Sequence, residues 1–315
     1  MTAVPAPGAH GGDGWAVATA LGIDPDSVLD LSQSLNPVAP DPAGIVARHW
    51  RALRTYPDPA AATASLAAAM GVEADRLVLT NGGSEAIALV AAELGGRVDE
   101  PEFSLHPRGP TGPRWRSNPH SPSGRLAGDD EQAGVWDEAF YPLATGTWTR
   151  GDAGAVVVGS LTKLLACPGL RAGYVLGQPA QVSRVRARQP QWSVNALAAA
   201  ALPDLLGAVD LSASAAAVRR LRAGLVEVLA RHGLVARPSD ANWVLVDAPG
   251  LRARLAPLGV VVRDCTSFGL PGTARIAVPP PAGLDRLDDA LGASAPAPSL
   301  PPTSPPPAGR LERTA

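Results

Sequence analysis

The chain has 315 residues, 46% of them hydrophobic, so it can bury a full core and is long enough for two structural units. Its formal net charge of −2 argues against a surface that binds nucleic acid or anionic membranes. Cys167 and Cys265 match no metal-ligand spacing, and no signal peptide or long apolar run is present, so we expect a soluble cytoplasmic protein without a metal.

The first predicted elements are a strand, a glycine turn and a helix. Residues 77–80 ("LVLT") are short and apolar, "NGG" ends this run, and "SEAIALVAAEL" follows with helical spacing. This order is typical of a βα unit in a parallel sheet. Further strands are predicted around residues 135–140, 155–160 and 172–177, with polar residues where they end. Ligands bind at that carboxyl edge of open α/β sheets, so we expect the site there.

The later part of the chain predicts a separate, smaller unit. A helical pattern runs from about residue 192 to residue 231 and stops at Gly233. It is followed by "NWVLVDAP", a short helix "GLRARLAPLG", then "VVVRDC", "ARIAVP" and the helix "GLDRLDDALG". This mixture indicates an α+β unit. From about residue 293 the chain is rich in Pro, Ser and Ala, which predicts disorder.

Lys163 is the only lysine among 27 basic residues, and it follows the strand predicted at 155–160. An amine can lose its proton and attack a carbonyl, whereas a guanidinium stays protonated. One lysine kept in an arginine-rich chain therefore indicates amine chemistry. Chance, or packing of the four-carbon stem, is the alternative. Such a lysine most often forms a Schiff base with pyridoxal phosphate.

Pyridoxal phosphate makes further demands, and the sequence offers residues for each. An acid must face the pyridine nitrogen, and Asp137 at a strand end could do so, the alternative being a solvated loop acid. The phosphate needs a cradle, which the turn before the first helix could supply through free N–H groups, although an ordinary turn would look the same. Serine and arginine side chains close to the lysine could add contacts. The candidates for this cradle are Gly82, Gly83, Ser84, Ser160 and Arg171.

Several motifs occur in an order that resembles a known family. "SLTKLLACPGLRAGY" is similar to the Ser-x-x-Lys and Gly-Leu-Arg-x-Gly signature of fold type I pyridoxal-phosphate enzymes, the class I/II aminotransferases. "DLSQSLNPVAP", "YPDP", "VLTNGGSEAIAL", "WDEAF", "SDANWVLVD" and "VVVRDCTSFGLPGTARIAV" resemble one branch of them. That branch holds histidinol-phosphate aminotransferases and the threonine-phosphate decarboxylases of cobalamin biosynthesis. The resemblance spans residues 29–291.

The resemblance implies an α/β fold, with a mostly parallel sheet in a shortened large domain and a smaller α+β C-terminal domain. The expected parts are an N-terminal arm at 1–35 packed on the small domain, the cofactor domain at 36–205, the small domain at 206–292 and the tail at 293–315. Shortening is expected because only about a dozen residues separate "EFSLH" from "NPHSPSG", where the family fits a helix and a strand.

The resemblance also implies roles for individual residues. Lys163 would hold the cofactor and move the proton of the substrate's α-carbon, while Asp137 would pair with the pyridine nitrogen. Tyr56 would reach the cofactor phosphate from the neighbouring subunit, which implies a homodimer with shared active sites. The other assignments are Gly83, Ser84, Ser160 and Arg171 at the phosphate, and Asn36, Arg263 and Arg275 at the substrate, a surface ion pair being the alternative for Arg263.

Three positions depart from the family's pattern. His106 stands where an aromatic ring stacks on the pyridine. Ser121 replaces an asparagine that holds the phenolic oxygen, and Phe140 replaces a tyrosine that shares this oxygen. Since hydrogen bonds to the phenolate favour its charged form, these changes bear on catalysis. Ser121 and His106, together with the shortened large domain, motivate the hypothesis of a catalytically degenerate protein that binds pyridoxal phosphate without turnover.

We expect an enzyme that acts on a small phosphorylated amino compound through an external aldimine. If Arg275 holds a carboxylate in the plane of the ring, the α-proton leaves and transamination follows. If Arg263 and Arg275 hold a phosphate, the carboxylate can stand perpendicular and leave as carbon dioxide. The motif "RDCTSFGLPG" favours a threonine-phosphate decarboxylase-like protein, with a histidinol-phosphate-type aminotransferase as the alternative.

Overall fold

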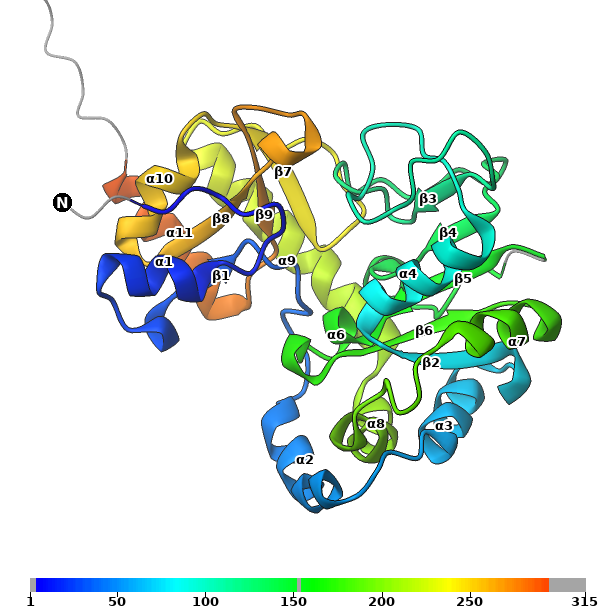
Figure 1. The fold of residues 1–315 in the computed structure, drawn as a ribbon. Coiled ribbons are helices and arrows are strands. Elements are labelled where there is room, and N and C mark those ends of the chain that lie inside the picture. Colours follow the sequence, from blue (N-terminus) through cyan, green and yellow to red (C-terminus); the bar gives the residue numbers. More distant parts are fainter. Residues whose placement is uncertain (1–3, 152–153, 295–315) are drawn as a thin grey trace, which may run out of the picture.

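The computed structural model describes residues 4–151 and 154–294, which contain two sheets joined by helices (Figure 1). From residue 295 on, the predicted tail lies outside the described residues. The strands are β1 (Leu29–Leu31), β2 (Leu77–Asn81), β3 (Trp115–Ser117), β4 (Val135–Asp137), β5 (Val156–Ser160), β6 (Ala172–Leu176), β7 (Trp243–Asp247), β8 (Val260–Asp264) and β9 (Thr273–Ala277). The helices are α1 (Gly14–Leu21), α2 (Pro42–Arg48), α3 (Ala60–Met70), α4 (Gly82–Leu94), α5 (Tyr141–Thr145), α6 (Leu161–Leu164), α7 (Pro179–Arg188), α8 (Ala196–Ala208), α9 (Leu211–Arg231), α10 (Leu251–Leu255) and α11 (Pro281–Ala293).

The larger sheet has the strand order β2-β6-β5-β4-β3. β3, β4 and β5 are parallel, whereas β6 runs antiparallel to both of its neighbours, β5 and β2. The chain returns from β5 to β6 through residues 161–171. A crossover between parallel strands needs a dozen residues or more, so this connection is too short for one. The predicted α/β fold is confirmed, and its large sheet is mixed.

The large sheet is reduced on the side of β3, which is an edge strand of three residues. Residues 95–114, all of them described, connect α4 to β3 without a helix. This stretch is tied to itself by an isolated bridge between Arg97 and Arg114. The shortening expected here is seen as the missing helix, while a short strand is retained.

The smaller sheet has the order β1-β8-β9-β7, and β1 comes from the N-terminal arm. Successive side chains of a strand point to opposite faces. Accordingly Val260 and Val262 of β8 join a core that contains Leu225 of α9 and Leu287 of α11. Val261, between them, packs against α1 on the other face. Covering both faces explains why β8 is an almost continuous apolar run.

The helical region predicted over residues 192–231 is two helices. The Asn195 side chain caps α8 by accepting the Ala198 N–H, and Asp210 caps α9 by accepting the Ala213 N–H. The two helices are bent by 79° at this break. α9 contacts α5 beside the large sheet and α11 and β7 of the small sheet, so it connects the two units (Figure 1).

Within residues 4–151 and 154–294, no single helix is long and apolar enough to cross a membrane, although α8 and α9 taken as one bent pair meet the same length and composition criteria.

Candidate active site

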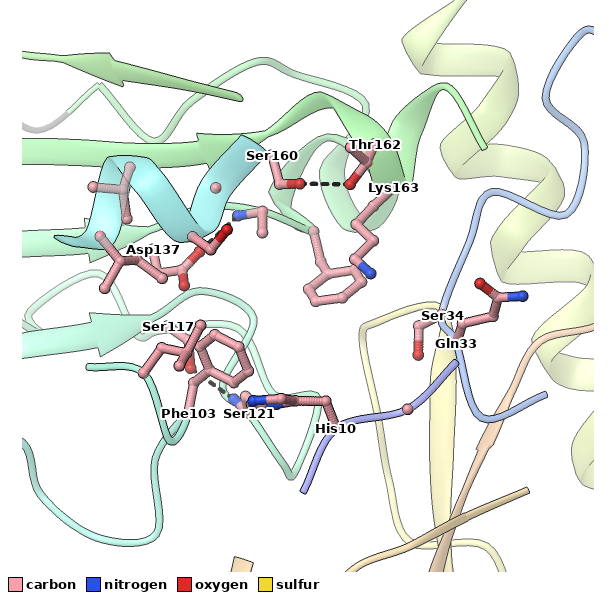
Figure 2. Close-up of a pocket in the computed structure, with 18 of the residues that line it drawn as sticks. His10, Gln33, Ser34, Phe103, Ser117, Ser121, Asp137, Ser160, Thr162 and Lys163 are labelled. Carbon is pink, nitrogen blue, oxygen red and sulfur yellow. Dashed lines mark hydrogen bonds between the residues drawn. The ribbon is translucent and has the colours of Figure 1, made fainter. Parts of the chain in front are cut away.

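A cavity of about 340 Å³ lies where the carboxyl ends of the parallel strands face the small sheet and the N-terminal arm (Figure 2). Ser117, Asp137 and Ser160 are the last residues of β3, β4 and β5, and all three line it. The small sheet contributes Arg263 and Arg275. The site therefore lies at the predicted strand edge, and it is completed by residues more than 100 positions away in sequence.

Lys163 lies on α6, directly after β5, and its side chain enters the cavity (Figure 2). Burial lowers the pKa of the Lys163 amine from 10.5 to about 8, and the positive charges of Arg275 and Arg171 act in the same direction. Its amine nitrogen lies 5.8 Å from the centre of the Phe140 ring. The amine is therefore unprotonated in a larger fraction of molecules near neutral pH than an exposed lysine would be.

This pKa predicts the pH dependence of Lys163 modification in cofactor-free protein. An amine reacts only when it is neutral, so the rate of attack on an added aldehyde should rise through a midpoint of about pH 8 and level off above it. The measurement is the rate of borohydride-trapped adduct at residue 163 as a function of pH. A midpoint near 10.5, the ordinary lysine value, would contradict the burial of the amine.

A cradle for an anion lies at the N-terminus of α4. Gly82 has a left-handed φ of +78°, and a Cβ there would clash with the guanidinium of Arg171. Arg171 in turn donates a hydrogen bond of 3.0 Å to the Ser84 hydroxyl, and Gly83 lies against Ser160. Free N–H groups at a helix start, together with a guanidinium and two hydroxyls, are the donors that a phosphate requires.

Substituting Gly82 by alanine is expected to weaken binding of pyridoxal phosphate. Gly71 is a matched control, because its φ is +67° but a Cβ there would meet open space. Both G82A and G71A should lower the free energy of unfolding by about 1 kcal/mol through backbone strain. Only G82A should also displace Arg171 and raise the dissociation constant of the cofactor, measured by absorbance titration. Equal cofactor affinities in the two variants would contradict the cradle.

Asp137 lines the cavity and is held from behind by His106. One carboxylate oxygen accepts the Ala139 N–H, and the other lies 2.9 Å from His106 Nε2. The His106 side chain is fully buried against Asp137 and does not line the cavity, and its stacking on the cofactor ring stays a prediction. Phe103 lines the cavity instead. The physical reason is that an imidazole buried here needs a polar partner, which Asp137 supplies, while a phenyl ring needs none.

Arg263 and Arg275 stand directly opposite each other on β8 and β9 and are 6% and 5% exposed. Among the described residues no carboxylate forms an ion pair with either of them. Arg263 donates to the Ala9 carbonyl and lies over Phe268, while Arg275 lies over Trp243. Burial, followed by the charge of Arg263, lowers the pKa of Arg275 to about 9. Two buried cations side by side without a counter-charge form a site for an anion.

Two other predicted residues do not line this cavity. Asn36 is buried, and its side chain donates to the Leu164 carbonyl and accepts the Val38 N–H. Its backbone N–H donates to the carbonyl of Lys163, so Asn36 helps to hold α6, and its contact with substrate stays a prediction. Tyr56 is 77% exposed and packs against Trp192. Its role toward a neighbouring subunit stays a prediction.

Apart from Gly82, which contacts Arg171 instead, the other predicted residues line the cavity, and so do residues that the sequence did not single out. Ser121 lines it and donates its N–H to Ser117. His10 of the N-terminal arm also lines it (Figure 2), and burial together with the charges of Arg263 and Lys163 lowers the pKa of His10. The two glycines that follow His10 in the sequence could have indicated a close approach of the backbone here. In the structure a Cβ on Gly11 would collide with the Ser32 carbonyl.

An amine of lowered pKa, set beside an acid and an anion cradle, is what an enzyme that uses pyridoxal phosphate requires, and this defines the class of the protein. The residues present fit this cofactor, because Gly82 has no side chain and lets the Arg171 guanidinium lie against the start of α4, where it can meet a phosphate. Residues 132–291 match the family model described as aminotransferase class I and II. The chain belongs to that family, whose enzymes depend on pyridoxal phosphate.

Named relatives agree with the family. The chain is 26% identical over 342 residues to histidinol-phosphate aminotransferase 1 of Thiobacillus denitrificans, covering 88% of each chain. It is similar in fold to histidinol-phosphate aminotransferase from Sinorhizobium meliloti in complex with pyridoxal-5'-phosphate (TM-score 0.74, 16% identity, 89% of this chain and 94% of that one). It is also similar in fold to L-threonine-O-3-phosphate decarboxylase from Porphyromonas gingivalis (TM-score 0.69, 22% identity, 82% and 98%).

Proposed function

We propose that this enzyme acts on a small amino compound that carries a phosphate group, and that it is a threonine-phosphate decarboxylase-like protein of cobalamin biosynthesis. The observation that carries the proposal is the buried pair Arg263 and Arg275, which face the cavity without a carboxylate partner among the described residues. A dianionic phosphate suits such a pair, because each guanidinium can donate two parallel hydrogen bonds to its oxygens.

The size of the cavity supports a small substrate. A small substrate beside the cofactor is compatible with a cavity of about 340 Å³. His10 stands close enough to Arg263 for the arginine's charge to act on it, and the Ala9 carbonyl accepts a hydrogen bond from Arg263. The N-terminal arm thus closes the side of the cavity at the arginine pair, and we assign the phosphate of the substrate to this side.

The protein's own groups then have distinct tasks. When bound, pyridoxal phosphate supplies an electron sink for the negative charge left on the substrate's α-carbon. Asp137 holds a proton at the pyridine nitrogen, and Lys163 Nζ delivers or removes the proton at the α-carbon. Arg263 and Arg275 decide which bond is presented to the sink. If they hold the phosphate, the carboxylate is free to leave, and Lys163 returns a proton to the α-carbon.

The test is to incubate the cofactor-loaded enzyme with threonine phosphate, and separately with histidinol phosphate plus 2-oxoglutarate. Release of carbon dioxide with the matching phosphorylated amine supports the proposal. Formation of glutamate would instead support a histidinol-phosphate-type aminotransferase, the function named for the curated relatives such as that of Thiobacillus denitrificans. Threonine and histidinol without phosphate are the controls. No turnover of any of them by fully loaded protein would support the degenerate, cofactor-binding hypothesis.

We also propose a homodimer with shared active sites. Trp50, Leu53, Tyr56 and Trp192 are 51%, 65%, 77% and 59% exposed, and Tyr56 and Trp192 pack against each other. Large exposed apolar groups gathered in this way mark an interface. We further propose a cytoplasmic location, supported by two cysteines that are both free.

Sedimentation of the loaded protein is expected to give a dimer. The double variant L53S/W192S should be monomeric, and Y56F should remain dimeric but bind pyridoxal phosphate more weakly, because the hydroxyl is assigned to the partner's phosphate site. A monomeric wild type with full cofactor affinity would contradict this assignment.

A further inference from the structure

A buried chain of contacts connects Asp137 and Ser121, the residues that we assign to opposite ends of the cofactor ring. We propose that Glu102, in the middle of this chain, is a positioning residue that couples the hold on the pyridine nitrogen to the hold on the phenolic oxygen. The inference rests on the proposed placement of the cofactor between these two residues.

The first half of the chain runs from Glu102 through His106 to Asp137. His106 Nε2 lies 2.9 Å from Asp137 Oδ2, and the other ring nitrogen, Nδ1, lies 3.8 Å from Glu102 Oε1. The side chains of His106 and Glu102 are 0% and 1% exposed. The Nδ1 atom has no hydrogen-bond partner among the described residues, so the Glu102 carboxyl is the polar group that faces this side of the ring. Glu102 and Asp137 therefore lie on opposite sides of the imidazole, and the position of the ring orients Asp137 toward the cavity.

The second half runs from Glu102 through Ser117 to Ser121, and Figure 2 shows its last link, from Ser117 to Ser121. Glu102 Oε2 accepts the Ser117 N–H at 2.9 Å, and Oε1 accepts the Ser117 hydroxyl. The Ser117 oxygen in turn accepts the Ser121 N–H at 2.7 Å. Because the Ser117 hydroxyl is committed to Glu102, its lone pairs face Ser121. Both serines line the cavity, so a change at Glu102 alters the position of Ser121 in its wall.

The burial of Glu102, which is 3% exposed, also points to a specific role. Burying a carboxylate is costly unless it is fully satisfied. Among the described residues no arginine forms an ion pair with Glu102: Arg108 lies beside it but donates to its backbone carbonyl and to the carboxylate of Glu100. The partners of the Glu102 carboxylate are Ser117, the Phe103 N–H and, across the longer gap, His106. The Glu102 carboxyl thus makes no ion pair with the nearby guanidinium, and its hydrogen bonds go to residues that line the cavity.

The test compares Glu102→Gln with Glu131→Gln. Glu131 is a matched control, because it is a partly buried glutamate held by Arg114 and Arg116 outside the cavity. Removing one charged hydrogen-bond partner inside the protein is expected to raise the dissociation constant of pyridoxal phosphate about tenfold in E102Q. The visible band of the loaded protein should shift. In cofactor-free protein labelled with 15N-histidine, the ring signal of residue 106 should move in E102Q and stay in E131Q.

Coupling between Glu102 and Ser121 predicts a second result, in double variants. The effects of E102Q and S121A on the cofactor dissociation constant should be non-additive by about fivefold or more, while E131Q and S121A should be additive. Wild-type affinity, an unmoved histidine signal and additive effects in a folded E102Q protein would overturn the inference.

If E102Q does not fold, two substitutions at His106 decide. H106Q keeps a donor toward Asp137 and should bind the cofactor within about threefold of wild type, whereas H106F should lose about tenfold. Equal affinity of H106F and wild type would reject the chain. D137N distinguishes an error in the proposed cofactor placement from an error in the role of Glu102. If D137N does not weaken cofactor binding, the proposed placement of the cofactor is wrong. If D137N weakens it while E102Q or H106F does not, only the role of Glu102 is wrong.

Discussion

Replacing Lys163 by arginine is expected to lower kcat by about 10²- to 10⁴-fold, the loss that follows when the group that moves a proton in the transition state is removed. Arginine keeps the positive charge and a long stem but does not lose its proton. The variant should still bind pyridoxal phosphate through the cradle at α4, whose donors it leaves intact. Activity should fall while noncovalent cofactor binding persists.

The measurement is borohydride reduction of the loaded protein followed by peptide mapping. Lys163 is the only lysine of the chain, so in wild type the reduced cofactor should be found on that side chain, and in K163R it should be absent. The double variant K163R/R188K restores one lysine at an exposed position that pairs with Glu93. At one equivalent of cofactor it should stay unlabelled, because it lacks the buried environment that lowers the pKa of Lys163 to about 8. Full turnover in K163R, or labelling at residue 188, would contradict the assignment.

Replacing Arg275 by methionine is expected to change activity and stability in opposite directions. Loss of one buried partner of a charged ligand costs about 2–5 kcal/mol, so kcat/KM for the phosphorylated substrate should fall about 10²- to 10³-fold. The same substrate without its phosphate should be affected far less. At the same time the free energy of unfolding should rise, because methionine removes a buried charge that no carboxylate of the described residues neutralises.

The sign of the stability change follows from the pKa of Arg275. Burial lowers it to about 9, below its ordinary 12.5, so the folded state disfavours the charged form that is present at neutral pH. The variant should therefore be more stable than wild type below about pH 9, and the difference should shrink as pH rises through that value. Thermal unfolding at several pH values checks this.

Arg237 provides the control for Arg275. It lies on the surface, 43% exposed in its side chain, and pairs with Asp247. R237M should leave kcat/KM unchanged and alter stability by less than about 1 kcal/mol. An equal loss of kcat/KM on phosphorylated and unphosphorylated substrates in R275M would place Arg275 at the substrate carboxylate and contradict its assignment to the phosphate.

The substrate site depends on both sheets, and this links the two expected results. Lys163 follows a strand of the large sheet, while Arg275 lies within a strand of the small one. α9 spans both units, and the N-terminal arm adds His10 at the cavity. A relative movement of the two units would therefore change the distance between the amine and the anion site.

Short stretches of the sequence are sufficient to predict the main helices and strands and the reactive side chains that they carry. The apolar runs of β2, β5 and β6, the glycine turn before α4 and the lone lysine after β5 all follow from local rules of periodicity, backbone freedom and side-chain acidity. The same rules could have located the break between α8 and α9, since Asn195 and Asp210 are helix-capping residue types.

Contacts between distant segments are needed for the rest, because a local pattern states a residue's type and not its neighbours. Phe103 and His106 are both aromatic and lie three positions apart, so the sequence does not distinguish them. The position of β4 places Asp137 against the imidazole of His106, while the ring of Phe103 faces the cavity. The sequence predicts Asn36 at the substrate, whereas in the structure its side-chain amide donates a hydrogen bond to the Leu164 carbonyl of α6. Tertiary packing also decides where a buried polar group finds its partner. It determines the direction of β6, the pairing of Arg263 with Arg275, the position of His10 at the cavity and the burial of Glu102.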